Sequence, residues 1–83
     1  MKVKIFKLSS GETVISCVES EDREFYILNN PYVLTEGEEQ KLLLPFAKNG
    51  SGIKFYKNNI VAECEPTSFV EASYAEKFEL ASA

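Results

Sequence analysis

The sequence contains no histidine and no tryptophan, and only two of its 83 residues are cysteines. The absence of histidine removes the side chain that most often serves as a general base at neutral pH and that most often ligates metal ions. Cys17 and Cys64 stand inside apolar runs and outside any Cys-x-x-Cys pair, so the ligand spacing of zinc and redox sites is missing. We predict buried, reduced thiols, no metal, no cofactor and no enzymatic activity.

Long apolar runs are also absent. No run, residues 42–44 included, approaches the roughly 20 apolar residues that a helix needs to cross a bilayer. The N-terminus lacks the apolar core of a signal peptide. The spacing of the two cysteines permits a disulfide, but small secreted domains that depend on disulfides usually carry more cysteines. We therefore expect a cytoplasmic protein with no membrane segment.

Basic residues are few. Nine lysines and arginines stand against thirteen aspartates and glutamates, and the net charge of −4 opposes non-specific attraction to polyphosphates. Any contact with nucleic acid must then be local. The hydrophobic share of 45% and the charged share of 27% are typical of a folded globular domain. The length predicts a single domain over residues 1–83 with a thin core.

What the chain does contain is a series of short apolar runs separated by turn residues, the pattern of an antiparallel β protein. Gly11 marks a turn between the first two runs, and Pro31, which cannot donate to a ladder, predicts a bend in the third. Asn58 and Asn59 tolerate positive φ angles and predict a tight hairpin between the last two. The predicted strands cover residues 2–8, 13–19, 24–34, 41–47, 53–57 and 60–65.

The second apolar run is hydrophobic on both faces. At a period of two, Val14 and Val18 point one way and Ile15 and Cys17 the other. A strand of this kind suits a strongly curved sheet or small barrel, in which one face lines the interior and the other meets a covering helix or a neighbouring subunit. The residues predicted to be buried include Val14, Ile15, Ile27, Phe55 and Ile60.

After Pro66 the period changes and predicts a helix over residues 68–81. Ser68 and Glu71 have the spacing of a capping box. The apolar positions at helical spacing are Val70, Tyr74, Phe78 and Ala81. The predicted fold class is mostly β, a small and strongly bent antiparallel sheet or barrel with one C-terminal helix.

One constellation in the strand region resembles the first motif of the Sm/LSm/Hfq-like family, which runs hydrophobic, Gly, hydrophobic, small, hydrophobic, Asp, hydrophobic. The residues that carry it are Leu8, Gly11, Val14, Val18 and Asp22, followed by Phe25, Ile27 and Leu28. Residues 7–15, Asn30-Pro31 and Leu-Pro-Phe at 44–46 look most like small Sm-like proteins of cyanophage type. The resemblance spans roughly residues 3–65 and implies a ring of about five to seven identical subunits that binds RNA.

The resemblance also indicates where nucleic acid would bind. The family contacts a uracil base from positions that are Glu24 and Tyr26 here, and a carboxylate neither stacks on a base nor attracts phosphate. The family's Arg-Gly loop corresponds to Lys57-Asn58-Asn59. The candidate nucleic-acid-binding residues are Lys57, Asn58, Asn59, Lys54, Lys48 and Tyr26.

Each of these assignments has a plainer alternative. The lysines and asparagines also fit ordinary solvated turns, and Tyr26, Phe55 and Tyr56 fit packing in a core or an interface as well as base stacking. The acidic residues Glu21, Asp22 and Glu24 fit a solvated turn better than a magnesium site.

Two functions of different classes follow. The first is a homo-oligomeric Sm-like ring that binds RNA or single-stranded DNA through loops near its pore, where repetition of a weak site raises avidity. The second is a phage-encoded interaction or assembly module that forms the same ring in the host cytoplasm without touching nucleic acid.

Overall fold

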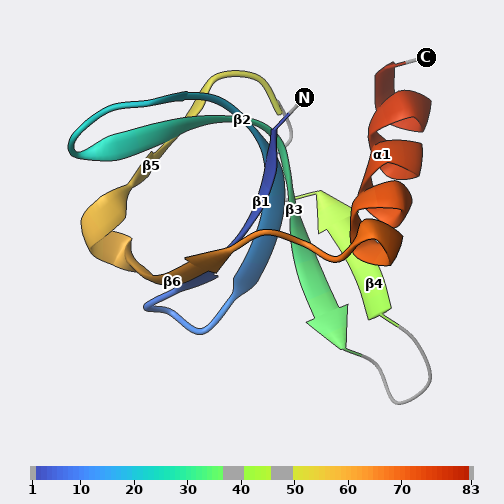
Figure 1. The fold of residues 1–83 in the computed structure, drawn as a ribbon, viewed down its shortest axis with the longest axis horizontal. Helices are drawn as coiled ribbons and strands as arrows, with labels where there is room; N and C mark the ends of the chain where they lie inside the picture. Colours follow the sequence, from blue (N-terminus) through green and yellow to red (C-terminus); the bar gives the residue numbers. More distant parts are fainter. Residues whose placement is uncertain (1, 37–40, 46–49, 83) are drawn as a thin grey trace.

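The computed structural model describes residues 2–36, 41–45 and 50–82, which form a strongly bent antiparallel sheet and one C-terminal helix (Figure 1). The elements are β1 (Val3–Leu8), β2 (Thr13–Glu21), β3 (Phe25–Glu36), β4 (Lys41–Pro45), β5 (Ile53–Tyr56), the 3₁₀ turn η1 (Lys57–Asn59), β6 (Ile60–Cys64) and α1 (Ser68–Ser82). The strand order is β4-β3-β2-β1-β6, and β5 pairs with β3 off this path. The predicted fold class is therefore confirmed. No helix in the described ranges is long and apolar enough to cross a bilayer.

The two faces of the sheet carry two separate hydrophobic clusters. Inside the curve of the sheet the cluster contains Phe6, Val14, Tyr26, Leu28 and Phe55, with Val18 packed against it. Under the helix the cluster contains Val3, Ile15, Tyr32 and Tyr74, with Val70 packed against it. In Figure 1 the helix lies on one side of the central strands, and β5, η1 and β6 lie on the other. The prediction that β2 is apolar on both faces, with one face under a covering helix, is confirmed.

Strand β3 pairs with β2 along one edge and, because it bends, with two different strands along the other. Its first half pairs with β5, from Phe25 opposite Tyr56 to Leu28 opposite Ile53, and its second half pairs with β4. Between the halves Asn30 has a φ of 54°, a left-handed conformation that Asn tolerates. The next residue, Pro31, needs no hydrogen-bond acceptor for its nitrogen. The bend predicted at this position is confirmed.

The helix is held by one buried tyrosine. Tyr74 is fully buried, and its hydroxyl accepts a hydrogen bond from the backbone N–H of Cys17 at 2.9 Å. The same hydroxyl lies 2.8 Å from the carbonyl oxygen of Asn30 and 3.1 Å from that of Asn29, to which it donates. Because desolvation by burial opposes ionisation, the pKa of Tyr74 is raised to about 12. α1 is thus bonded to both β2 and the bend of β3.

Three local expectations were wrong. The last two strands form no hairpin, because β5 pairs with β3 and β6 pairs with β1; Asn58 and Asn59 lie in the 3₁₀ turn and have no positive φ. Cys64 is exposed, since β6 lies at an edge of the sheet, whereas Cys17 is buried as predicted; both thiols are free. The capping box expected at Ser68 and Glu71 is not what begins the helix. Thr67 caps it instead, because its Oγ1 accepts a hydrogen bond from the backbone N–H of Val70 at 3.3 Å.

The predicted core was largely correct. Val14, Ile15 and Phe55 are buried, while Ile27 and Ile60 are half-buried. Gly11 has a φ of 104°, as its place in the turn between β1 and β2 requires. Of the four apolar positions predicted for the helix, Val70 and Tyr74 face the sheet. The side chains of Phe78 and Ala81 are not among those that the structure describes.

Candidate nucleic-acid interface

The turn η1 presents the candidate loop Lys57-Asn58-Asn59 and is bonded at both ends to turns of the sheet, the one before β3 and the one after β1. The backbone N–H of Lys57 donates to the carbonyl oxygen of Glu24 at 2.8 Å, and the backbone N–H of Ser9 donates to the carbonyl oxygen of Asn59 at 2.8 Å. The side chains of Asn58 and Asn59 are exposed. The loop is therefore a fixed platform with two amide side chains in solvent.

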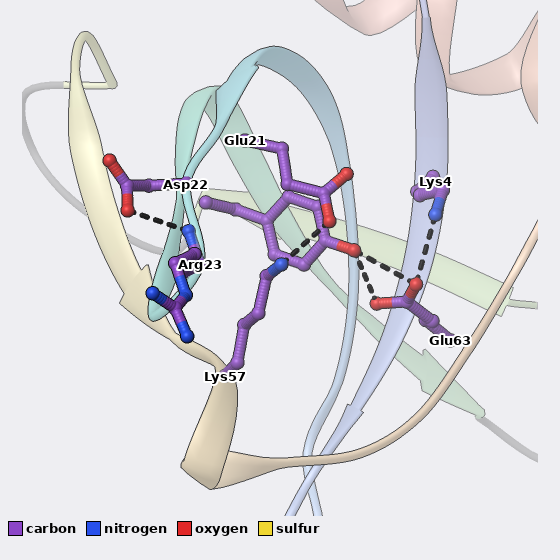
Figure 2. Close-up of polar contacts among 7 residues, drawn as sticks. Lys4, Glu21, Asp22, Arg23, Lys57 and Glu63 are labelled. Carbon is purple, nitrogen blue, oxygen red and sulfur yellow. Dashed lines mark hydrogen bonds and ion pairs between the residues drawn. The ribbon is translucent and has the colours of Figure 1, made fainter.

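Lys57 does not project freely from this platform. Its ammonium nitrogen lies 2.6 Å from Glu21 Oε2, at the end of β2, and 5.0 Å from the centre of the Tyr26 ring (Figure 2). The hydrogen bond from Lys57 is the main cause that lowers the pKa of Glu21. A phosphate that reaches Lys57 must therefore compete with a carboxylate that already holds it.

Tyr26 lies in the core, with only 2% of its surface exposed. Its ring packs on Phe6 with a centroid separation of 5.1 Å. Its hydroxyl donates to the carboxylate of Glu63, at 2.8 Å from each oxygen. The two interpretations of Tyr26, base stacking and core packing, thus separate: burial leaves no ring face open to a base in this conformation, which favours core packing.

Glu63 links Tyr26 to β1. Lys4 Nζ lies 3.0 Å from Glu63 Oε1. Figure 2 shows the bonds that join Lys4, Glu63 and the tyrosine hydroxyl, and the separate ion pair between Lys57 and Glu21. Hydrogen bonds from Tyr26 and then from Lys4 lower the pKa of Glu63, because they stabilise its charged form. Burial, followed by the bond to Glu63, raises the pKa of Tyr26. The network thus pairs two lysines, Lys4 and Lys57, with carboxylates.

Lys54, on β5, is arranged differently. Its ammonium lies over two aromatic rings, 4.5 Å from the centre of Phe25 and 5.9 Å from that of Tyr56. Tyr56 is half exposed, at 50%, whereas Phe55 on the opposite face of the strand is buried. A pocket of about 210 Å³ adjoins this strand. It is lined by Leu8, Ile53, Lys54, Phe55, Tyr56 and Asn59.

The acidic turn between β2 and β3 is folded back on itself. The backbone N–H of Asp22 donates to the carbonyl oxygen of Phe25 at 2.8 Å, and the Asp22 carboxylate accepts from the backbone N–H of Arg23 at 2.6 Å.

Among the described residues, no three His, Cys, Asp or Glu side chains gather in a way that could hold a metal ion. The pKa of the Cys17 thiol is raised, mainly by burial, which keeps it protonated and unreactive.

The structure thus brings some predicted site residues together and separates others. Lys57, Asn58 and Asn59 share the turn η1, and Lys54 lies on the strand that leads into it. Tyr26 belongs to the core, and Lys48 lies outside the described residues. Sequence reasoning missed Glu63, which is 37 residues from Tyr26 and reaches it only because β6 pairs with β1. Nothing in the local pattern around residue 63 signals that contact.

Comparisons with known proteins add no relative: no protein-family model matches the chain, and no curated protein matches it.

Proposed function

We propose that the protein is a homo-oligomeric Sm-like module that binds single-stranded nucleic acid, RNA in the first place, at the turn η1. The observation that carries the proposal is the anchored platform, which presents Asn58 and Asn59 to solvent from a turn bonded at both ends. Amide side chains offer both donors and acceptors, the chemistry that pairs with the edges of unpaired bases. Because the turn is already ordered, little conformational entropy is lost on binding.

Lys57 and Lys54 supply the positive charge beside those amides. Each site is weak, because a single loop with two lysines makes few phosphate contacts and the net charge of the chain is −4. Copies of the site in one assembly would raise the overall affinity by avidity. The proposed function therefore requires self-association as well as the loop.

Open strand edges support self-association. In the described part of the chain, β6 pairs only with β1 and β5 only with β3, so each has one edge without a partner strand. Val61 on β6 is 64% exposed. An unpaired edge with apolar side chains favours addition of a strand from another chain. Head-to-tail addition with a fixed rotation closes a ring, here of about five to seven subunits by the resemblance to Sm-like proteins.

The test is fluorescence anisotropy of labelled oligo(U), oligo(A) and oligo(dT) with the wild-type protein at low salt and then at increasing salt. We expect binding that weakens steeply with salt, because phosphate contacts release counterions. Lys57→Glu should abolish it, and Lys77→Glu, the same charge change at an exposed position of α1, should weaken it far less. Glu24→Tyr should strengthen it by adding a stacking surface and removing a negative charge. Unchanged binding by Lys57→Glu would show that η1 is not the site.

A second candidate is a protein-interaction or assembly module that binds no nucleic acid. The ion pair between Lys57 and Glu21 favours it, because the cation nearest the loop is already neutralised. Light scattering combined with the anisotropy assay separates the two. A stable oligomer that binds none of the oligonucleotides at low salt supports the assembly module, and a monomer at micromolar concentration contradicts both.

A further inference from the structure

The outer face of the β3–β5 ribbon carries an aromatic surface with a cation on it. Phe25 and Tyr56 are direct partners in the register, and their rings meet edge to face with centroids 6.2 Å apart. Lys54 lies two residues before Tyr56 and so shares its face of the strand, where its ammonium reaches both rings. A cation and two rings thus form one continuous surface.

This surface is open to a ligand in two respects. Tyr56 is 50% exposed, whereas the other aromatic residue of β5, Phe55, is 8% exposed. Lys54 has no carboxylate partner among the described residues, in contrast to Lys57, whose charge is held by Glu21. Its contacts with the two rings leave its charge available, because a cation over an aromatic face keeps its donors for an anion on the other side.

Beside the rings lies the pocket of about 210 Å³. Leu8, Ile53 and Phe55 give it an apolar lining, and Asn59 adds an amide. Its volume is below the roughly 300–1,000 Å³ of a pocket that takes a drug-sized ligand. The pocket therefore suits one small planar group that lies against apolar side chains and is anchored at its edge by a polar contact.

We propose that a base of single-stranded nucleic acid stacks on Tyr56 at the mouth of this pocket and that Lys54 binds the adjoining phosphate. Stacking on an aromatic side chain beside a cation is a recurrent, sequence-tolerant way to hold single strands. The inference rests on the proposed function and specifies its contacts. It supplies the stacking ring that Glu24 does not provide and places it on β5, next to the exposed amides of η1.

The experiment uses the absence of tryptophan from the chain. Tyr56→Trp introduces a single tryptophan, and its fluorescence is followed as unlabelled oligo(U) is added, while anisotropy of labelled oligo(U) reports binding independently. Stacking should quench the tryptophan with the same concentration dependence as the anisotropy change. Phe69→Trp is the matched control, because Phe69 is 80% exposed but lies on α1, and its fluorescence should not change.

Two further variants measure the contributions. Tyr56→Ala should reduce the affinity for oligo(U) about 5- to 100-fold, and Tyr56→Phe should retain it, because stacking needs the ring and not the hydroxyl. Lys54→Gln should lower the slope of log affinity against log salt by about one. Circular dichroism and light scattering of each variant confirm that fold and oligomer are intact.

The outcomes separate the two proposals. If oligo(U) binds but the Tyr56→Trp signal stays constant and Tyr56→Ala binds normally, the stacking site is wrong and the proposed function survives. If Tyr56→Ala changes the oligomer mass, Tyr56 belongs to a contact between copies of the chain and the stacking site is again wrong. If no oligonucleotide binds wild type at low salt, both proposals fail.

Discussion

Removal of one hydroxyl group, in Tyr74→Phe, should uncouple α1 from the sheet. The change leaves the ring in place and deletes the partner of the Cys17 N–H and of the Asn30 carbonyl. Tyr74 is fully buried, so water cannot replace those bonds without movement of the helix. A buried donor left without a partner costs about 1–3 kcal/mol, and loss of the second bond adds to it. We expect a destabilisation of about 2–3 kcal/mol.

The raised pKa of Tyr74 adds a pH dependence. Because burial disfavours the phenolate, a pKa of about 12 against the ordinary 10 means that ionisation of Tyr74 costs the folded state roughly 3 kcal/mol relative to the unfolded chain. Because the folded state holds the proton more tightly, this contribution is complete below pH 10 and is lost as pH rises from about 10 to about 12. The Phe variant has no proton to lose here, so the difference in stability between it and wild type should shrink over that window.

The assay is urea unfolding and thermal unfolding, each followed by circular dichroism and repeated from neutral to alkaline pH. For a domain of this size, 2 kcal/mol lowers the midpoint of thermal unfolding by roughly 8–16 °C. Tyr32→Phe is the matched control: Tyr32 is also buried and meets the Tyr74 ring at 5.9 Å, but its hydroxyl makes no hydrogen bond with the described residues. A Tyr74→Phe variant within about 0.5 kcal/mol of wild type would refute the reasoning.

Three other predictions concern the site and the first turn. Glu21→Gln should raise the affinity for oligo(U) a few-fold more than Glu19→Gln, the same charge change on the same strand, and the excess should vanish when Lys57 is replaced by Met. Glu63→Gln should destabilise the fold at neutral pH and progressively less in acid. The hydrogen bonds from Tyr26 and Lys4 hold the pKa of Glu63 below its ordinary value, so the stability they add is present above that ordinary pKa and is lost as pH falls; urea unfolding at several pH values checks it. Gly11→Ala should lower the free energy of unfolding in urea by about 1 kcal/mol, since a φ of 104° strains any residue with a Cβ; a neutral result would contradict it.

Much of the fold could be predicted from local sequence because its strands are short and separated by strong turn residues. The alternation in β2 placed Val14 and Ile15 on opposite faces, and both are buried in different clusters. Gly11 and Pro31 placed a turn and a bend where the chain has them. These features depend on residues within a few positions of one another, so the pattern alone specifies them.

Strand pairing could not be predicted in the same way. The hairpin expected between β5 and β6 assumed that neighbours in sequence pair, but the bend of β3 offers its first half to β5, and β1 takes β6. The exposure of Cys64 follows from that pairing, since it leaves β6 at an edge. Both facts depend on the curvature of the whole sheet.

In the candidate site, too, the local features could be predicted and the long-range contacts could not. The grouping of Lys57, Asn58 and Asn59 was visible in sequence because they are consecutive. That Glu21 holds Lys57, and that Tyr26 is buried beneath the loop, are long-range contacts that no local pattern indicates.

The ladder between β1 and β6 also bears on how the chain is made. Ile5 lies opposite Cys64, so β1 leaves the ribosome well before the strand that covers its edge. At about 5–20 residues per second, the delay is on the order of 3–12 s. During that interval β1 and β2 present an uncovered edge to other nascent chains. Synthesis on crowded polysomes would therefore place identical edges close together, and a chaperone that shields β1 early should raise the yield of correctly folded protein.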